Sequence, residues 1–372
     1  MTASITKTKA KTSWGNALYT GEKNYDVVKY RWRFYAVSIL LCVFALAAIG
    51  VRGLNLGIDF TGGSEFTISG TAEHDQDRAI SAVHEIAPND EPLVSSVGDN
   101  SIRVQTGAID GQDKINSLRD KLASAYGVSN DKVSNTTIGP TWGASVGSKA
   151  LEGLVVFLIA IALFMSAYFH SVQMAAAGIV ALLHDLIITV GVYAVVGWEI
   201  TPASVIGFLT ILGYSMYDTV VVFDKVRENT RVVFAQTRSK YSELANLAVN
   251  QTLVRSINTS VVALLPIGAI LFFGVFYMGA GTLRDIALAL FVGMAVGAYS
   301  SIFLATPLEV SLRQFSKKIK AHNHSVEVAR EEFKKKLAES GQEVSEDAVR
   351  VAKLLPGVRL DNTAQPKRRK KK

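Results

Sequence analysis

Residues 203–223 read ASVIGFLTILGYSMYDTVVVF, an apolar run that carries a single carboxylate, Asp218. A helix needs roughly 20 apolar residues to cross the hydrocarbon core of a bilayer, and this stretch is long enough. An aspartate near the centre of such a helix costs roughly 2.5 to 3.5 kcal/mol even on the milder insertion scales. The run therefore predicts a membrane-spanning helix with a carboxylate whose presence needs a physical reason.

Two interpretations of Asp218 are open. A carboxylate inside a span usually moves ions, pairs with a group on another helix, or does both. Alternatively, Asp218 is solvated near the membrane edge, because the charged sequence Asp224-Lys225-Val226-Arg227-Glu228 follows within about two helical turns. We favour the first interpretation.

The rest of the composition is typical of a polytopic membrane protein. Of 372 residues, 49% are hydrophobic and only 19% are charged, which leaves room for one modest soluble region. Six stretches have approximately the length of a span: Phe34–Val51, Leu154–Phe169, Val172–Val196, Ala203–Phe223, Asn258–Phe276 and Ile286–Leu308. The first is expected to be an uncleaved anchor, since no small-residue cleavage site follows it. It contains the single cysteine, Cys42, so no internal disulfide is expected.

Lysine and arginine mark one side of this predicted bundle. They are frequent before the first span, between the fourth and fifth spans, and in the C-terminal tail. The connector between the third and fourth spans, residues 197–201, has none, and the one between the fifth and sixth has only Arg284. Basic residues concentrate in cytoplasmic loops. We therefore expect both termini in the cytoplasm and residues 52–148 on the outer side.

Residues 52–148 predict one small α+β domain. Short strands alternate with two amphipathic helices in the order β-α-β-β-α-β, which is that of a ferredoxin-like sandwich. Such a fold carries no chemistry by itself. The predicted organisation is an N-terminal arm 1–33, a first helix 34–51, the α+β domain 52–148, helices two to six within 149–308, and a basic, partly disordered tail 309–372.

Several motifs lie in order along this frame: Gly57-Ile58-Asp59-Phe60-Thr61-Gly62-Gly63, Gly139-Pro140-Thr141-Trp142-Gly143, Gly213-Tyr214-Ser215, Asp218 to Glu228, and Arg255-Ser256-Ile257-Asn258-Thr259-Ser260. Over roughly residues 25–312, the chain resembles the SecF family, the smaller subunit of the bacterial SecDF protein-export complex. The resemblance implies a resistance-nodulation-division transporter that uses the proton-motive force to help preproteins across the membrane. The implied partners are SecD, the SecYEG translocon, its motor SecA and unfolded preproteins.

The resemblance also implies roles for single residues. Asp218 would carry protons, and Arg255, at the head of the fifth span, would act beside it. The family usually has Asn before this aspartate, whereas this chain has Tyr217, which puts the detail of the proton path in doubt. The other positions that match the fourth-span motif are Gly213, Tyr214, Ser215, Thr219, Asp224, Arg227 and Glu228.

Asp185 is a second ionisable residue inside a predicted span. It either extends a proton relay with Asp218 or satisfies a neighbouring helix through one hydrogen bond. The adjacent His184 is expected to point elsewhere on the helix and to be a packed polar residue.

The glycine motif after the first span favours a structural role. Aspartate is a good turn former, and glycine permits a positive φ. We expect a hinge or an interface, rather than transport chemistry, at four positions: Gly57, Asp59, Gly62 and Gly63.

Motifs for nucleotide, metal or covalent catalysis are missing. We therefore expect no enzymatic activity, no metal and no cofactor, with protons as the coupling ion. The basic cluster at residues 367–372 would attract anionic lipid headgroups at ~1 kcal/mol per residue near the surface. Ribosomal RNA, or plain solvation of a disordered tail, are the alternatives.

These observations predict a multi-pass protein of the bacterial inner membrane that promotes preprotein export with SecD. Two other functions stay open. One is a proton-driven exporter of lipids or small molecules from the same superfamily, although six spans and one small outer domain argue against it. The other is a non-transporting scaffold of the translocon, which would leave Asp218 without a role.

Overall fold

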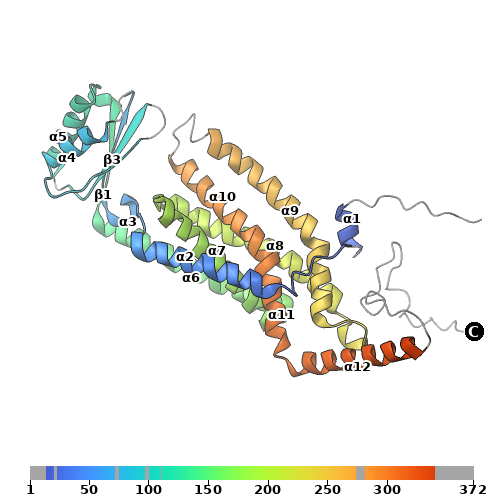
Figure 1. The fold of residues 1–372 in the computed structure, drawn as a ribbon. Helices are drawn as coiled ribbons and strands as arrows, with labels where there is room; N and C mark the ends of the chain where they lie inside the picture. The colour runs from blue at the N-terminus through green and yellow to red at the C-terminus, as the bar shows by residue number, and fades with distance from the viewer. Residues whose placement is uncertain are drawn as a thin grey trace, which may run out of the picture.

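The computed structural model describes residues 14–20, 23–71, 75–96, 100–109, 111–273 and 281–339. Within these residues, six helices are long and apolar enough to cross a membrane. They are α2 Arg31–Arg52, α6 Pro140–Phe169, α7 Val172–Val196, α8 Pro202–Thr230, α9 Tyr241–Phe273 and α10 Gly281–Ser300. Figure 1 shows one elongated helical bundle with a small α+β domain at one end. The predicted fold class is confirmed.

Most of these helices are longer than the apolar stretches that predict them. α6 begins at Pro140, inside the segment expected to belong to the outer domain, and proline suits a first helical turn because no N–H is needed there. α8 continues past Phe223, and α9 begins at Tyr241 rather than near Asn258. The last residues of the expected fifth span, 274–276, and the basic cluster at 367–372 lie outside the described residues.

The sixth span contains an irregular turn. α10 passes through the π-helical turn η4, Ser301–Ala305, directly into α11, Thr306–Gln314. A π-helix closes its hydrogen bonds over five residues instead of four, and single π-turns inside α-helices often occur at functional sites. Ser301 of this turn contacts Asp218, and the preceding residue, Ser300 of α10, contacts Asp185.

Helices α7, α8 and α10 form the interior of the bundle. In its most apolar window, α7 is 50% buried, whereas α2, α6 and α9 are each 11% buried. Glycines permit close crossings: a Cβ on Gly191 of α7 would lie 2.7 Å from the Cα of Ala45 on α2, and one on Gly207 of α8 would lie 2.6 Å from the Cβ of Ala289 on α10. The low burial of α2, α6 and α9 means that these three helices leave broad apolar faces exposed.

The α+β domain is a four-stranded antiparallel sheet with two helices. Its elements are β1 Gly63–Ser69, α4 Gln76–His84, β2 Leu93–Ser96, β3 Ser101–Thr106, α5 Gln112–Ala125 and β4 Val133–Ile138. The strand order is β2-β3-β1-β4. Alternate residues of the central strands are fully buried, among them Phe66, Ile68, Ile102 and Val104, and they pack against Leu118 and Leu122 of α5. The predicted β-α-β-β-α-β order is confirmed.

The opposite end of the bundle carries two further helices, α1 Trp14–Tyr19 and α12 Lys317–Glu339 (Figure 1). The extended start of α9 holds the N-terminal segment: the side-chain oxygens of Asn246 and Asn250 accept from the backbone N–H groups of Val28 and Tyr25 over 3.0 and 2.7 Å. These contacts show why α9 begins well before its apolar stretch.

Candidate functional site

Helix α8 places Asp218 inside the bundle, where the residue is 8% exposed. Ser256 of α9 donates a hydrogen bond from Oγ to Asp218 Oδ1 over 2.8 Å, and Ser301 of the π-turn donates to Oδ2 over 2.5 Å. Both serines are fully buried. Asp218 is therefore surrounded by protein rather than by solvent, and it links α8 to both α9 and the sixth span.

A second buried carboxylate, Asp185 of α7, is fully enclosed. Its Oδ2 accepts from Ser215 of α8 over 2.5 Å and from Ser300 of α10 over 2.7 Å. Gly297 leaves room beside it, since a Cβ there would lie 3.6 Å from Oδ2. Asp185 is thus hydrogen-bonded to two neighbouring helices, where sequence reasoning considered one such bond.

The two carboxylate sites share one backbone connection. Ser300 reaches Asp185 and the next residue, Ser301, reaches Asp218. Successive side chains of an α-helix point about 100° apart, so two consecutive serines at the start of the π-turn serve carboxylates on two different helices. Sequence reasoning identified both aspartates but missed Ser300 and Ser301.

His184 differs from its expected orientation. Its Nδ1 lies 3.0 Å from Asp185 Oδ1, although the side chains of these neighbouring residues were expected to point apart. The ring is 5% exposed and stacks on Tyr299 with centroids 6.3 Å apart. His184 Nε2 is buried without a hydrogen-bond partner among the described residues. The imidazole therefore belongs to the Asp185 site.

Arg255 is not brought into contact with Asp218 in this structure. Within the described residues the side-chain contacts of Asp218 are to Ser256 and Ser301, and Arg255 is exposed. Tyr217, 57% exposed, also lies on the outside of the bundle, whereas Tyr214 donates from its hydroxyl to the backbone oxygen of Thr259 over 3.1 Å. The Asp218 site of this single chain thus contains only neutral donors.

The remaining motif positions of α8 lie around the site or toward the end of the helix. Thr219 is buried, and a Cβ on Gly213 would meet open space. Asp224 accepts from the Tyr168 hydroxyl over 2.9 Å, and Arg227 donates to the Tyr168 backbone oxygen over 3.3 Å. Glu228 pairs with Lys225 on the surface. These charged residues tie α8 to the end of α6 and do not reach the buried carboxylates.

The glycine motif forms the turn that joins the first span to the α+β domain. It contains the short helix α3, Ile58–Thr61. Gly62 and Gly63 have φ of +75° and +141°, and a Cβ on them would lie 2.7 Å from Pro140 Cα and 2.3 Å from Thr106 O. Burial raises the pKa of the Asp59 carboxyl in this turn, and the carboxylates of Glu65 and Asp285 raise it further. The geometry supports a junction role for these residues.

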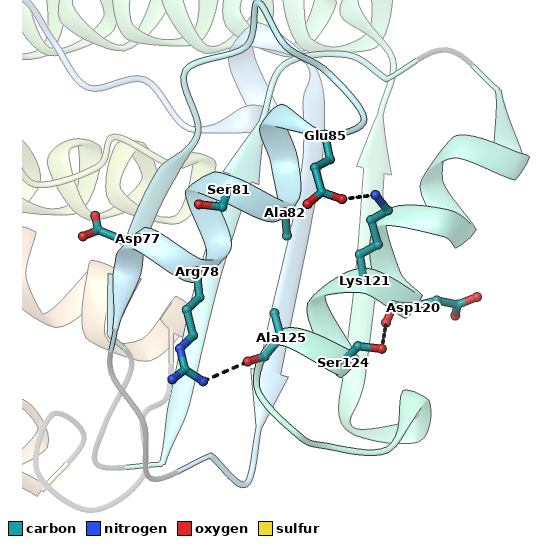
Figure 2. A pocket seen from close by; sticks show the side chains of 9 residues that line it. All are labelled: Asp77, Arg78, Ser81, Ala82, Glu85, Asp120, Lys121, Ser124 and Ala125. Atoms are coloured by element: carbon teal, nitrogen blue, oxygen red, sulfur yellow. Dashed lines mark hydrogen bonds and ion pairs between the residues drawn. The ribbon is translucent and has the colours of Figure 1, made fainter.

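A shallow groove between α4 and α5 is lined mainly by polar and charged side chains (Figure 2). Glu85 and Lys121 pair across it, and Arg78 donates to the backbone oxygen of Ala125 over 3.2 Å. These pairs are exposed, so they are expected to contribute little. In the described part of the chain no group of His, Cys, Asp and Glu has the arrangement of a metal site.

Two family profiles match this chain. The family described as "Protein export membrane protein SecD/SecF, C-terminal" matches residues 118–314, which include Asp185 and Asp218. The "SecD/SecF GG Motif" matches residues 47–70, which include the glycine turn.

Curated relatives and solved structures agree with these profiles. The chain is 46% identical over 307 residues to the protein translocase subunit SecF of Streptomyces coelicolor, with 82% of each chain covered. It is 40% identical over 325 residues to that of Mycobacterium tuberculosis H37Rv, covering 84% of this chain and 73% of the relative. The crystal structure of SecDF from Thermus thermophilus, a translocon-associated membrane protein, superposes with a TM-score of 0.70 at 31% identity. That match covers 79% of this chain, whereas this chain spans 39% of that protein.

Proposed function

The chain belongs to the SecF family of protein translocase subunits, and from this premise we propose that it uses the proton-motive force, with a SecD partner, to promote the movement of preproteins across the bacterial inner membrane. Its membership makes it an accessory subunit of Sec export. In the proposal it performs no catalysis of its own, and protons are its only coupling ion.

The burial of Asp218 carries this proposal. An ionised carboxylate is costly in a low-dielectric interior, and here its two oxygens are satisfied by Ser256 and Ser301 alone. An ionised carboxylate only accepts, whereas a protonated one also donates. When the proton binds, one serine must therefore reorient or move away. The protonation state of Asp218 is in this way coupled to how α9 and the sixth span pack on α8.

Asp185 is the second member of the proposed relay. It is connected to Asp218 through the peptide that joins Ser300 to Ser301, and His184 adds a proton-binding group beside it. A change at one carboxylate that rotates this turn changes the hydrogen bonds of the other. The two sites then respond together, as transport through a relay requires.

Arg255 is proposed to act in the assembled complex. Arg255 and Tyr217 are both exposed, on faces of α9 and α8 that this chain leaves uncovered. The solved SecDF protein is longer than this chain, which spans 39% of it, and this supports a SecD partner on such a face. SecYEG, SecA and preproteins complete the proposed machinery, with anionic lipid at the basic tail.

The function is tested by preprotein translocation into inner-membrane vesicles that contain or lack this chain. We expect faster completion with the chain only when a proton gradient is present, so an uncoupler should remove the difference. A difference that persists with the uncoupler would instead indicate a scaffold. No difference in export under a full gradient would contradict the proposal and favour an exporter of lipids or small molecules.

The proposed orientation places both termini in the cytoplasm. Asn100 in the α+β domain and Thr237 in the α8–α9 connector are both exposed. The α+β domain lies at one end of the bundle, whereas α12 lies at the other end, beside the start of α9 (Figure 1). In a Cys42→Ala background, we expect Asn100→Cys to react with an impermeant thiol reagent from outside intact spheroplasts, and Thr237→Cys to react only after lysis. Reaction of both from the outside would overturn the orientation.

A further inference from the structure

The α+β domain rests on the bundle through the loop that joins α7 to α8. The segment after the first span forms a parallel bridge with this loop: Gly57 donates its backbone N–H to Ile200 O over 2.9 Å, and Ile200 donates to Asn55 O over 2.7 Å. The loop therefore lies directly against the turn that leads into β1.

Glu199 of this loop extends from the bundle into the sheet. Its Oε1 accepts from Gln105 Nε2 over 2.7 Å, and its Oε2 lies 3.5 Å from Arg103 Nη1. Gln105 and Arg103 belong to β3, and both also contact Glu65 of β1, over 3.0 and 3.5 Å. One guanidinium and one amide thus hold two carboxylates, one from the bundle and one from the domain.

The glycine motif makes room for this contact. A Cβ on Gly57 would lie 2.6 Å from Glu199 Oε1, so a larger residue would displace the carboxylate from Gln105. The side chains of Arg103 and Glu199 are only 15% and 13% exposed. The cluster is enclosed between the domain and the bundle.

Among the described residues, the charged groups around the partly buried Glu199 are two carboxylates and two guanidinium groups. Those that face it from each packed element are Arg103 and Gln105 on β3, Glu65 on β1, Asp285 on α10 with its neighbour Arg284, and Gly57, which has no side chain. Burial raises the pKa of the Glu199 carboxyl; Gln105 and Arg103 act against this, and Glu65 and Asp285 act with it.

We propose that Glu199, held by Gln105 and Arg103, is a proton-binding site at which protonation on the outer side strengthens the docking of the α+β domain on the bundle. The site lies at the junction and is separate from the buried carboxylates of the spans. It does not require Asp218 to carry protons.

The direction of the effect follows from linkage. When the domain swings away, Glu199 becomes a solvated glutamate with an ordinary pKa of about 4.3. The docked form has the higher pKa, so docking takes up a proton. The additional stabilisation of the docked form is complete below the pKa of undocked Glu199, and it is lost as the pH rises through the raised pKa of docked Glu199. Each unit of difference between the two values changes the docking equilibrium up to tenfold.

A distance measurement by pulsed EPR tests the proposal on the full chain in lipid vesicles. Spin labels at Lys132→Cys and Val196→Cys, both exposed positions, report the separation of the domain from the end of α7 in a Cys42→Ala background. We expect the docked population to rise several-fold between about pH 8 and about pH 4.5. Glu199→Gln, which cannot ionise, should stay docked throughout this range.

Two variants complete the experiment. Arg103→Gln removes the cation that favours ionised Glu199, so the docking transition should move to higher pH. Glu85→Gln changes an exposed carboxylate directly after α4 and should leave the transition as in the parent protein. A docked population that is independent of pH in the parent protein, or the same transition in Glu199→Gln, would overturn the proposal. The EPR distance in each variant is measured without any export assay.

Discussion

The Asp218→Asn variant is expected to insert and assemble normally but to lose its stimulation of preprotein export, down to the level of vesicles that lack the chain. Asparagine keeps the size of the side chain, and its oxygen still accepts from one serine, so the packing of α8 against α9 and the sixth span should persist. It cannot bind and release a proton near neutral pH. The measurement is the rate of completed translocation under a proton gradient, at equal amounts of membrane-inserted protein.

Glu228→Gln is the matched control, because Glu228 lies on the same helix but its carboxylate is exposed and paired with Lys225. It should retain the export activity of the parent protein. If Asp218→Asn supports gradient-dependent export as well as Glu228→Gln does, Asp218 is not the proton carrier. Ser256 and Ser301 would then be structural partners of a buried carboxylate and nothing more.

Gly63→Ala is expected to destabilise the α+β domain by about 2 to 6 kcal/mol. Two effects add: alanine at a φ of +141° is strained by about 1 to 3 kcal/mol, and its Cβ would overlap the backbone oxygen of Thr106, 2.3 Å away in the paired strand, which costs about 1 to 3 kcal/mol more. For a domain of this size the melting temperature should fall by at least about 8 °C. Pulse proteolysis of the full chain at rising temperature measures the loss of protection.

Gly70→Ala separates the two effects. Gly70 also has a positive φ, +81°, but a Cβ there meets nothing within 4 Å. Only the backbone term remains, about 1 to 2 kcal/mol. Equal destabilisation by the two substitutions would show that the close approach of Thr106 does not matter. The glycine motif would then be needed for its φ values alone.

The elements that could be predicted from the sequence are those set by local patterns. Apolar length alone indicates the six spans, because a bilayer demands it, and alternation in β1 and β3 indicates the strands of the domain. The cost of a carboxylate in a span singles out Asp218 and Asp185 before any contact is known. Each of these signals depends on residues that are close together in the chain.

The partners of the carboxylates depend on how helices are rotated about their axes, which no local pattern reports. Ser256 belongs to the same motif as Arg255, but the family resemblance made Arg255 the expected partner. Ser300 and Ser301 are small residues of a kind common in helical bundles. No sequence pattern predicts the π-turn that directs them toward the two carboxylates. The contact between Glu199 and Arg103 joins two segments whose separation in the chain hides it. Long-range geometry is therefore where sequence reasoning stops.

The π-turn at Ser301–Ala305 gives the sixth span two registers. Residues 283–300 follow the register that directs Ser300 to Asp185, and residues 306–314 follow the one that places the buried Glu309 against Tyr241. Because one residue corresponds to about 100° of helical rotation, deleting a single residue within the turn would twist one half of the span against the other. The halves could not then both keep their contacts. The number of residues between Ser300 and Glu309 is thus as much a part of the site as their identities.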